Sequence, residues 1–256
     1  MYSTAFRSRS SPGNTLALVS LHVSWRICDS NRLLLVGWTG AGKSSLSLAL
    51  LRMIPTKGSV FFDGVDIGNF NLDALRNSIT VIPQQPELMS GTIRQNLDPF
   101  EEHDDATLNA CWQSAGLHDV DEGVGNGLDA SVSSGGTNFS LGQRQIIALA
   151  RAIVRRSKVY VLDEATASVD YETDAAIQEA IATEFDGLTL IVVAHRLQAI
   201  MTTDRIMVLD GGRAVEFDTP QALLEKGGRF REMVDGSGDA TVLYEMAARQ
   251  KGGQKY

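Results

Sequence analysis

The stretch GWTGAGKS, residues 37–44, constrains the fold of this chain more than any other part of the sequence. It follows the apolar run LLLV at residues 33–36, which is typical of a buried parallel strand, and it precedes a leucine-rich stretch with helical spacing. This is the pattern G-x-x-x-x-G-K-[ST] in its strand, loop and helix context. We expect a chance glycine turn to match the bare pattern in roughly one chain of this size in a hundred, and the flanking elements lower that chance further.

The spacing of this loop suits a chain of phosphates. Glycines allow the backbone to curl so that successive N–H groups point inward. We expect Lys43 to place its cation on the β- and γ-phosphates and the Ser44 hydroxyl to ligate Mg²⁺. The sequence therefore predicts a nucleoside triphosphate site, whose expected contacts are Gly37, Trp38, Thr39, Gly40, Ala41, Gly42, Lys43, Ser44 and Ser45.

A second apolar run, at residues 159–162, ends in Asp163 and Glu164. An aspartate at the carboxyl end of a strand near a phosphate loop can hold Mg²⁺ through water. Glu164 is then placed to act as a general base on a water that attacks the γ-phosphate. A solvated acidic strand end is the alternative interpretation, but beside a phosphate loop the functional one is favoured.

A third apolar run, at residues 189–194, is followed by His195. A lone histidine is more often a packed or surface residue than a catalyst. Here it ends a core-type strand at the edge where active sites of parallel sheets lie. A neutral imidazole at that edge can bond the γ-phosphate or the attacking water.

The composition excludes several classes of protein. The 256 residues carry a formal net charge of −8 and no long run of Lys or Arg, which argues against a nucleic-acid binder. Two isolated cysteines, Cys28 and Cys111, do not make a disulfide framework or a zinc site, and they favour a reducing compartment. From the distribution of apolar residues we expect neither a membrane-spanning stretch nor a secretory signal in these 256 residues.

The stretch TNFSLGQRQ, residues 137–145, predicts the start of another helix. A helix N-terminus offers backbone N–H groups and a positive dipole end, which suit a phosphate. An ordinary capped helix is an equally valid interpretation, because the residues that follow form an apolar stripe for a core: Ile146, Ile147, Leu149, Ala150, Ile153 and Val154.

Together these segments resemble the motifs of ATP-binding cassette (ABC) proteins over about residues 16–246. GWTGAGKS resembles the Walker A loop, VYVLD the Walker B strand and FSLGQ the signature loop. Gln84 resembles the Q-loop glutamine, Asp170 the D-loop aspartate and His195 the switch histidine. All occur in the family's order. SGTIRQNLDPF and GGTNFSLGQRQIIALARA further resemble the second cassette of C-subfamily exporters of the multidrug-resistance-protein type.

The resemblance implies an α/β fold, a P-loop NTPase (RecA-like) core with a mainly parallel sheet, an N-terminal antiparallel β subdomain and an inserted helical subdomain at about residues 86–150. A strand pair turning at Asp63–Gly64, a hairpin at Gly211–Gly212 and a helical remainder complete the expected cassette. Residues 1–15 and 247–256 are expected to be a loose segment and a mobile polar tail.

The resemblance also implies the chemistry and the partners. Lys43, Glu164 and His195 are the expected catalytic residues, and the expected Mg²⁺ ligands are Ser44, Gln84 and Asp163. Two cassettes of the family pack head to tail, so the signature would contact ATP held by a partner cassette through Ser140, Leu141, Gly142 and Gln143. The remaining partners would be ATP and the transmembrane domains of an exporter, at the cytosolic face of a membrane.

The sequence departs from the family pattern at several positions. Trp38 stands where the C subfamily usually has arginine, and Phe139 and Leu141 alter the signature. Ser10, in SSPG, occupies the place of the aromatic residue that stacks on adenine, and residues 21–32 lack the usual Pro-Gly turn. Loss of a stacking aromatic weakens binding by about 1–3 kcal/mol. We therefore expect a fragment of a longer transporter or an altered N-terminus.

Two alternative functions are compatible with parts of the sequence. A truncated nucleotide-binding module with weak or no hydrolysis is supported by Ser10 and opposed by Lys43, Glu164 and His195. A soluble ABC ATPase acting on ribosomes or DNA is disfavoured by the acidic charge and by the absence of sustained heptads between Lys43 and Asp163.

Overall fold

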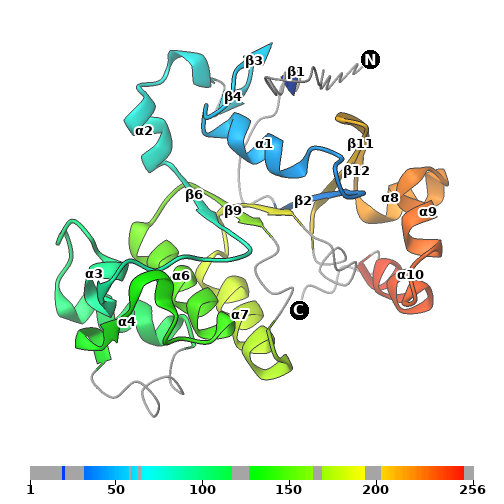
Figure 1. Ribbon diagram of the computed structural model, residues 1–256. Helices are drawn as coiled ribbons and strands as arrows, with labels where there is room; N and C mark the ends of the chain where they lie inside the picture. Colours follow the sequence, from blue (N-terminus) through cyan, green and yellow to red (C-terminus); the bar gives the residue numbers. More distant parts are fainter. Residues whose placement is uncertain are drawn as a thin grey trace. The chain divides into compact units, whose positions relative to one another are not determined.

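The computed structural model describes residues 19–20, 32–57, 59–62, 65–116, 127–163, 169–193 and 203–250 (Figure 1). The chain forms two compact units. The first contains Met1–Ile79 and Thr189–Tyr256, and the second contains Thr80–Leu188. No helix in the described ranges is both long enough and apolar enough to cross a membrane.

The first unit is built on strand β2 (Arg32–Gly37), which leads into the phosphate loop. It lies between β10 (Thr189–Val193) and β11 (Arg205–Asp210) and runs parallel to both. Its apolar run is fully buried, as expected for a strand covered on both faces. β11 turns back through Gly211 and Gly212 into the antiparallel β12 (Arg213–Asp218), which confirms the predicted hairpin.

Helices α8, α9 and α10 cover one face of these strands (Figure 1). Alternate residues of β2 and β11 point to that face because successive side chains of a strand alternate. The buried cluster consists of Leu34, Val36, Ile206, Val208, Leu223, Leu224, Phe230, Val234, Leu243 and Ala247. The helices are α8 (Pro220–Lys226), α9 (Arg229–Asp235) and α10 (Ala240–Gln250).

Short elements make up the rest of the first unit. The antiparallel pair β4 (Phe61–Phe62) and β5 (Val65–Asp66) confirms the predicted strand pair, although its turn at Asp63–Gly64 lies outside the described residues. The other elements are β1 (Val19–Ser20), which pairs in parallel with β3 (Thr56–Lys57), α1 (Lys43–Leu50), the 3₁₀ turn η1 (Ile67–Asn69) and α2 (Leu72–Asn77).

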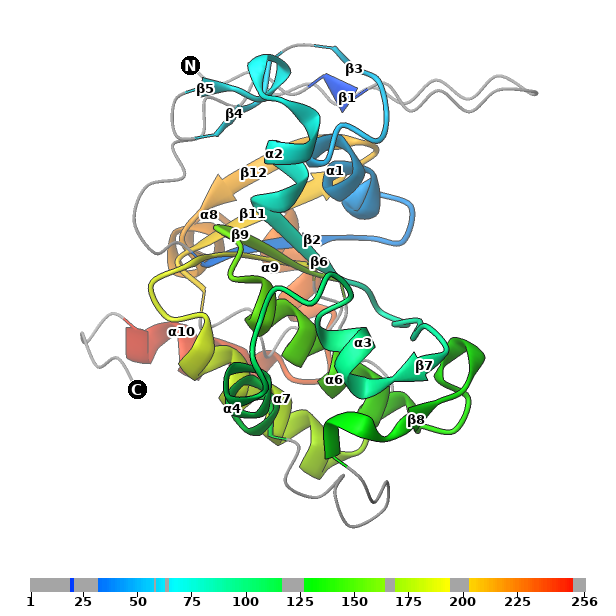
Figure 2. The same ribbon diagram turned by 90° about the vertical axis from the view of Figure 1, so that its left-hand side faces the viewer.

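The second unit is mainly helical and is organised around α6 (Leu141–Arg155), which contacts α3 (Ile93–Leu97), α4 (Asp105–Ser114) and α7 (Tyr171–Glu184) (Figure 2). Its strands β6 (Ile79–Ile82) and β9 (Val159–Asp163) are neighbours. The remaining elements are the strand pair β7 (Gly91–Thr92) and β8 (Ser131–Val132) and the 3₁₀ turns η3 (Gly127–Asp129) and η4 (Ser134–Gly136).

These elements confirm the predicted α/β class with its mainly parallel sheet. The strands expected at residues 33–36, 159–162 and 189–194 are present as β2, β9 and β10. Residues 1–18 and 251–256, with Ser10, lie outside the described residues.

A buried carboxylate joins the C-terminal helices to the sheet. Glu216 of β12 accepts hydrogen bonds from the backbone N–H groups of Arg229 and Phe230, each at 2.9 Å. These are among the first N–H groups of α9, which have no partner inside the helix. A Cβ atom on Gly228 would overlap the Glu216 carboxylate, so glycine is needed at that approach.

A buried aspartate organises the loop after α3. Asp98 accepts a hydrogen bond from the backbone N–H of His103 at 2.7 Å, and the His103 ring lies 3.2 Å from the same oxygen. Burial alone would raise the pKa of Asp98. Backbone hydrogen bonds from His103 and Glu102, with the His103 ring, outweigh it and hold that pKa below its ordinary value.

We predict that Glu216→Ala lowers the free energy of unfolding by about 3 kcal/mol, because two charge-assisted hydrogen bonds are lost, one from a buried N–H group and one from a part-buried N–H group. Urea denaturation measures this change. Glu87→Ala, at an exposed site, is the control and should change stability by less than about 0.5 kcal/mol. Equal effects of the two substitutions would contradict the capping role of Glu216.

We predict that the stabilisation by Asp98 depends on pH. A carboxyl group whose pKa is lowered in the folded state stabilises that state fully above its ordinary pKa of 3.8, and the contribution is lost as the pH falls through the folded-state pKa. The destabilisation by Asp98→Asn, measured by urea denaturation, should therefore be largest near neutral pH and shrink below about pH 4. Asp186→Asn, at an exposed site, is the control, and a pH trend of equal size in that variant would contradict the role of Asp98.

Candidate functional site

The phosphate loop of the first unit is shaped by glycines at its turns. Gly40 has a φ of 81°, and Gly42, the residue before α1, has a φ of 102°. Residues other than glycine rarely adopt this backbone conformation. Gly37 is required for a different reason, since a Cβ atom there would overlap the backbone oxygen of Leu209 on β11. The loop is thus fixed by backbone conformation at one end and by close approach to a strand at the other.

Lys43 bridges the two ends of the loop. Its side chain is only 7% exposed, and its Nζ donates to the backbone oxygen of Gly37 at 2.8 Å and to that of Trp38 at 3.4 Å. The cation therefore lies inside the curl of the loop, at the start of α1. The first turn of α1 contains no acidic residue, so no carboxylate in that turn offsets the positive end of the helix or the lysine.

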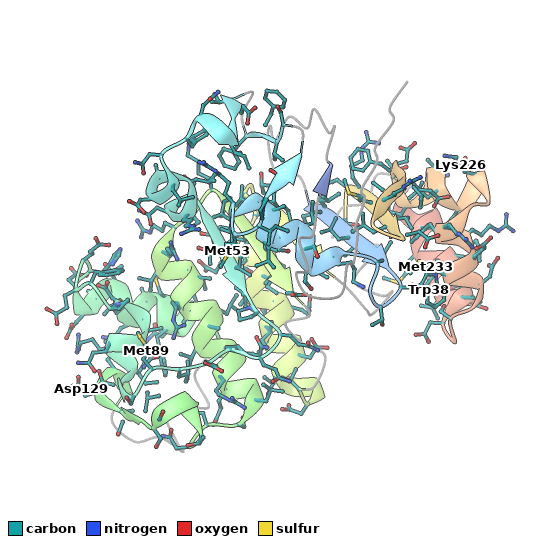
Figure 3. The ribbon with its side chains drawn as sticks, turned by 45° about the horizontal axis from the view of Figure 1, so that its top comes forward. Trp38, Met53, Met89, Asp129, Lys226 and Met233 are labelled. Carbon is teal, nitrogen blue, oxygen red and sulfur yellow. The ribbon has the colours of Figure 1, made fainter. Side chains whose placement is uncertain are left out.

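The outer side of the loop is open to solvent. Trp38 is 64% exposed on the loop after β2 (Figure 3), and Thr39 and Ser44 are also exposed. Ala41 is buried, and its backbone oxygen accepts a hydrogen bond from the N–H of Gly212 at 3.2 Å. The hairpin between β11 and β12 thereby supports the loop, a contact that the sequence analysis did not foresee.

In the second unit, Gln84 and Asp163 lie at or just beyond the ends of two neighbouring strands, β6 and β9. Asp163 is the last residue of β9 and is half-buried, whereas Gln84 is exposed just beyond β6. Glu164 directly follows β9, and His195 comes two positions after the end of β10, but both lie outside the described residues. Their predicted roles therefore stay predictions.

The predicted signature forms the N-terminus of α6, which confirms the capped-helix interpretation. The Ser140 hydroxyl accepts the backbone N–H of Gln143 at 3.1 Å, and the Gln143 side chain accepts the backbone N–H of Ser140 at 2.9 Å. This reciprocal capping box fixes both side chains. The predicted apolar stripe is buried except at Ile153, and it anchors the helix in the second unit.

The signature glycine and the predicted D-loop aspartate meet through one threonine. Asp170 caps α7 by accepting the backbone N–H of Thr173 at 2.9 Å and the Thr173 hydroxyl at 2.8 Å. A Cβ atom on Gly142 would lie 2.9 Å from the Thr173 methyl group, so glycine allows α6 to approach α7 here. The structure therefore brings Gly142 and Asp170 together within the second unit.

Two residues of the second unit, Thr173 and Gln145, were not predicted from the sequence. Gln145 is a buried amide next to the apolar stripe of α6, and it donates to the backbone oxygens of Pro83 and Gln84. A polar residue beside an apolar helix face was the available signal for Gln145. For Thr173 the signal was its place three residues after Asp170, the spacing of a helix cap.

Three comparisons with known proteins bear on the site. Residues 21–167 match the family model described as ABC transporter. The chain is 47% identical, over 209 residues, to a probable multidrug resistance-associated protein of Drosophila melanogaster, covering 81% of this chain and 15% of that one. It is 44% identical, over 228 residues, to ATP-binding cassette sub-family C member 2 of Rattus norvegicus, covering 89% of this chain and 15% of that one.

A solved structure agrees with these relatives. The structure of a bacterial Atm1-family ABC exporter with ATP bound matches with a TM-score of 0.74 and 31% sequence identity. The match covers 80% of this chain and 36% of the exporter chain. The chain thus spans about 15% of the length of the two curated relatives named above.

We predict that Gly142→Ala destabilises the chain by about 1–3 kcal/mol, because the added methyl group overpacks the contact with Thr173. Thr173→Ser removes the methyl group but keeps the hydroxyl that donates a hydrogen bond to Asp170. The double variant should recover most of the loss in urea denaturation, giving a favourable coupling between the two sites. Additive effects of the two substitutions would contradict the contact.

Proposed function

The chain belongs to the ABC transporter family as an ATP-binding cassette of the ATPase class, and we propose that it powers solute export through a membrane transporter. Its fold is that of a P-loop NTPase, as the exporter match indicates. The observation that carries the proposal is the buried Lys43 inside a glycine-shaped loop at the start of α1. The names of its relatives, multidrug resistance-associated and sub-family C proteins, support an exporter.

In this proposal the loop binds ATP by exchanging internal hydrogen bonds for bonds to phosphate. Lys43 Nζ, held by the oxygens of Gly37 and Trp38, turns its cation onto the β- and γ-phosphates. Backbone N–H groups around Gly40 and Gly42 and the N-terminus of α1 neutralise the remaining charge. The other predicted loop contacts, from Thr39 to Ser45, line the same bend.

The proposed Mg²⁺ ligands have the donor chemistry that this ion prefers. Ser44 offers a hydroxyl oxygen, Gln84 an amide oxygen and Asp163 a carboxylate, and Mg²⁺ binds oxygen donors almost exclusively. Ser44 and Gln84 are exposed and Asp163 is half-buried, so each side chain is accessible to an ion. When bound, Mg²⁺ supplies positive charge that offsets the charge on the phosphates. We assign these residues to it as part of the proposal.

Besides Lys43, two further residues are proposed to carry the reaction. Glu164 takes a proton from the attacking water as general base, and His195 holds the γ-phosphate. The family resemblance of the positions after β9 and β10 supports both assignments. Asp170, which caps α7, belongs to the proposed D-loop.

A second cassette is the proposed partner. The preformed N-terminus of α6, with Ser140, Leu141, Gly142 and Gln143, would contact ATP held by that partner, as the head-to-tail pairing of the family implies. Transmembrane domains would complete the exporter and hold the cassette at the cytosolic face of a membrane. Residues 16–246 are proposed as the cassette itself. The matches to exporters favour this function over a module without hydrolysis.

Thermal unfolding with and without MgATP tests the binding site. ATP at about one hundred times its dissociation constant stabilises a binding-competent chain by about 2.7 kcal/mol, seen as a Tm several degrees higher. Glu164→Gln should keep this shift but lower hydrolysis by at least about a hundredfold, because only the general base is lost. Hydrolysis is measured as released phosphate, at chain concentrations that allow two cassettes to pair.

The controls separate binding from turnover. Lys43→Ala should lose the MgATP shift, because the cation on the phosphates is removed. Glu179→Gln, the same change at an exposed site of α7, should alter neither property. A cooperative melt that MgATP does not shift would contradict the binding site, and undiminished hydrolysis by Glu164→Gln would refute the assignment of the base.

A further inference from the structure

Gln145 is the polar side chain through which α6 holds the segment that contains Gln84. It lies in the second turn of α6 and is only 2% exposed. Its Nε2 donates to the backbone oxygen of Pro83 at 3.3 Å and to that of Gln84. The helix that begins with the signature is therefore bonded directly to the backbone of the proposed Mg²⁺ ligand.

The chemistry of this contact requires a hydrogen-bond donor at this position. Both partners are carbonyl oxygens, so only the NH₂ group of Gln145 can face them. Its Oε1 is buried and has no hydrogen-bond partner among the described residues. A buried amide with an unpaired oxygen packs less favourably than an apolar side chain of the same size. Glutamine therefore differs from methionine at this position by its two hydrogen bonds to the backbone oxygens of Pro83 and Gln84.

A second contact on α6 holds the far end of the same segment. Arg151 donates through Nε to the backbone oxygen of Asn96 at 2.7 Å and through Nη2 to the Asn96 side chain at 3.0 Å. Asn96 is fully buried and bonds both the N–H and the oxygen of Met89. This anchor contacts neither Gln84 nor the signature, so it provides an internal comparison for Gln145.

We propose that Gln145 is a positioning residue. It couples the position of the signature end of α6 to the position of the Gln84 backbone. A shift of α6 on contact with a partner's ATP would move the Gln84 backbone, and with it the amide proposed to hold Mg²⁺. The coupling is reciprocal, because any link between two binding events acts in both directions. This inference rests on the proposed function, which assigns Gln84 to Mg²⁺ and the signature to the partner.

The test measures how much Mg²⁺ strengthens ATP binding. The dissociation constant of ATP is determined for the 256-residue chain from ligand-dependent shifts of Tm, once with excess Mg²⁺ and once with excess EDTA. The ratio of the two constants is the Mg²⁺ gain. It reports on the ligands of the ion and does not change when a substitution lowers stability alone.

Gln145→Met should shrink the Mg²⁺ gain by about tenfold, the low end of the effect of removing a group that orients a metal ligand. ATP binding in EDTA should stay within about twofold of that of the unsubstituted chain. Arg151→Met should lower the Tm without ATP and leave the Mg²⁺ gain unchanged. Gln145→Leu also removes the donor without burying a charge, so it should have the same effect on the Mg²⁺ gain and replaces Gln145→Met if the methionine variant fails to fold.

A double-substitution cycle with Gln84→Ala completes the test. If Gln145 acts through Gln84, the Mg²⁺ gain of the double variant should equal that of Gln84→Ala alone. An unchanged gain in both Gln145 variants, an equal loss in Arg151→Met, or independent losses in the cycle would overturn the inference. If the unsubstituted chain shows no ATP-dependent shift, or no Mg²⁺ gain, the proposed function itself is contradicted and the inference falls with it.

Discussion

The proposed nucleotide site depends on the hydrogen bonds that hold the buried ammonium group of Lys43 inside its loop. Lysine is almost never fully buried, because losing water penalises its charge. The backbone oxygens of Gly37 and Trp38 replace that water, and they point at the lysine only because the loop curls around it. Loop shape and buried charge therefore stabilise each other. The curl also depends on the neighbouring hairpin. The backbone oxygen of Leu209 leaves no room for a side chain at Gly37, and the N–H of Gly212 donates a hydrogen bond to the backbone oxygen of Ala41.

The features predictable from the sequence are those that depend on neighbouring residues in the chain. Runs of apolar residues identify β2, β9 and β10, and paired glycines identify the hairpin between β11 and β12. The capping box at Ser140 needs only the spacing of two side chains. The phosphate loop was recognisable for the same reason, since its strand, glycines and lysine are contiguous.

The features that the sequence did not reveal depend on residues far apart in the chain. Gln145 meets carbonyl groups about sixty positions earlier, and no local pattern states which carbonyls a buried amide will face. Thr173 is an ordinary helix-capping partner until α6 brings Gly142 against it. Glu216 looks like a strand residue facing solvent, yet it closes the N-terminus of α9. Each of these contacts is set by packing between elements.

The capping box at the start of α6 has a consequence for association. Ser140 and Gln143 hold each other in place through two hydrogen bonds before any partner arrives. A surface whose rotamers are already fixed loses little conformational entropy when another molecule docks on it. Complex formation at this turn would therefore be limited by the encounter of the two molecules more than by the ordering of a loop, which favours rapid association.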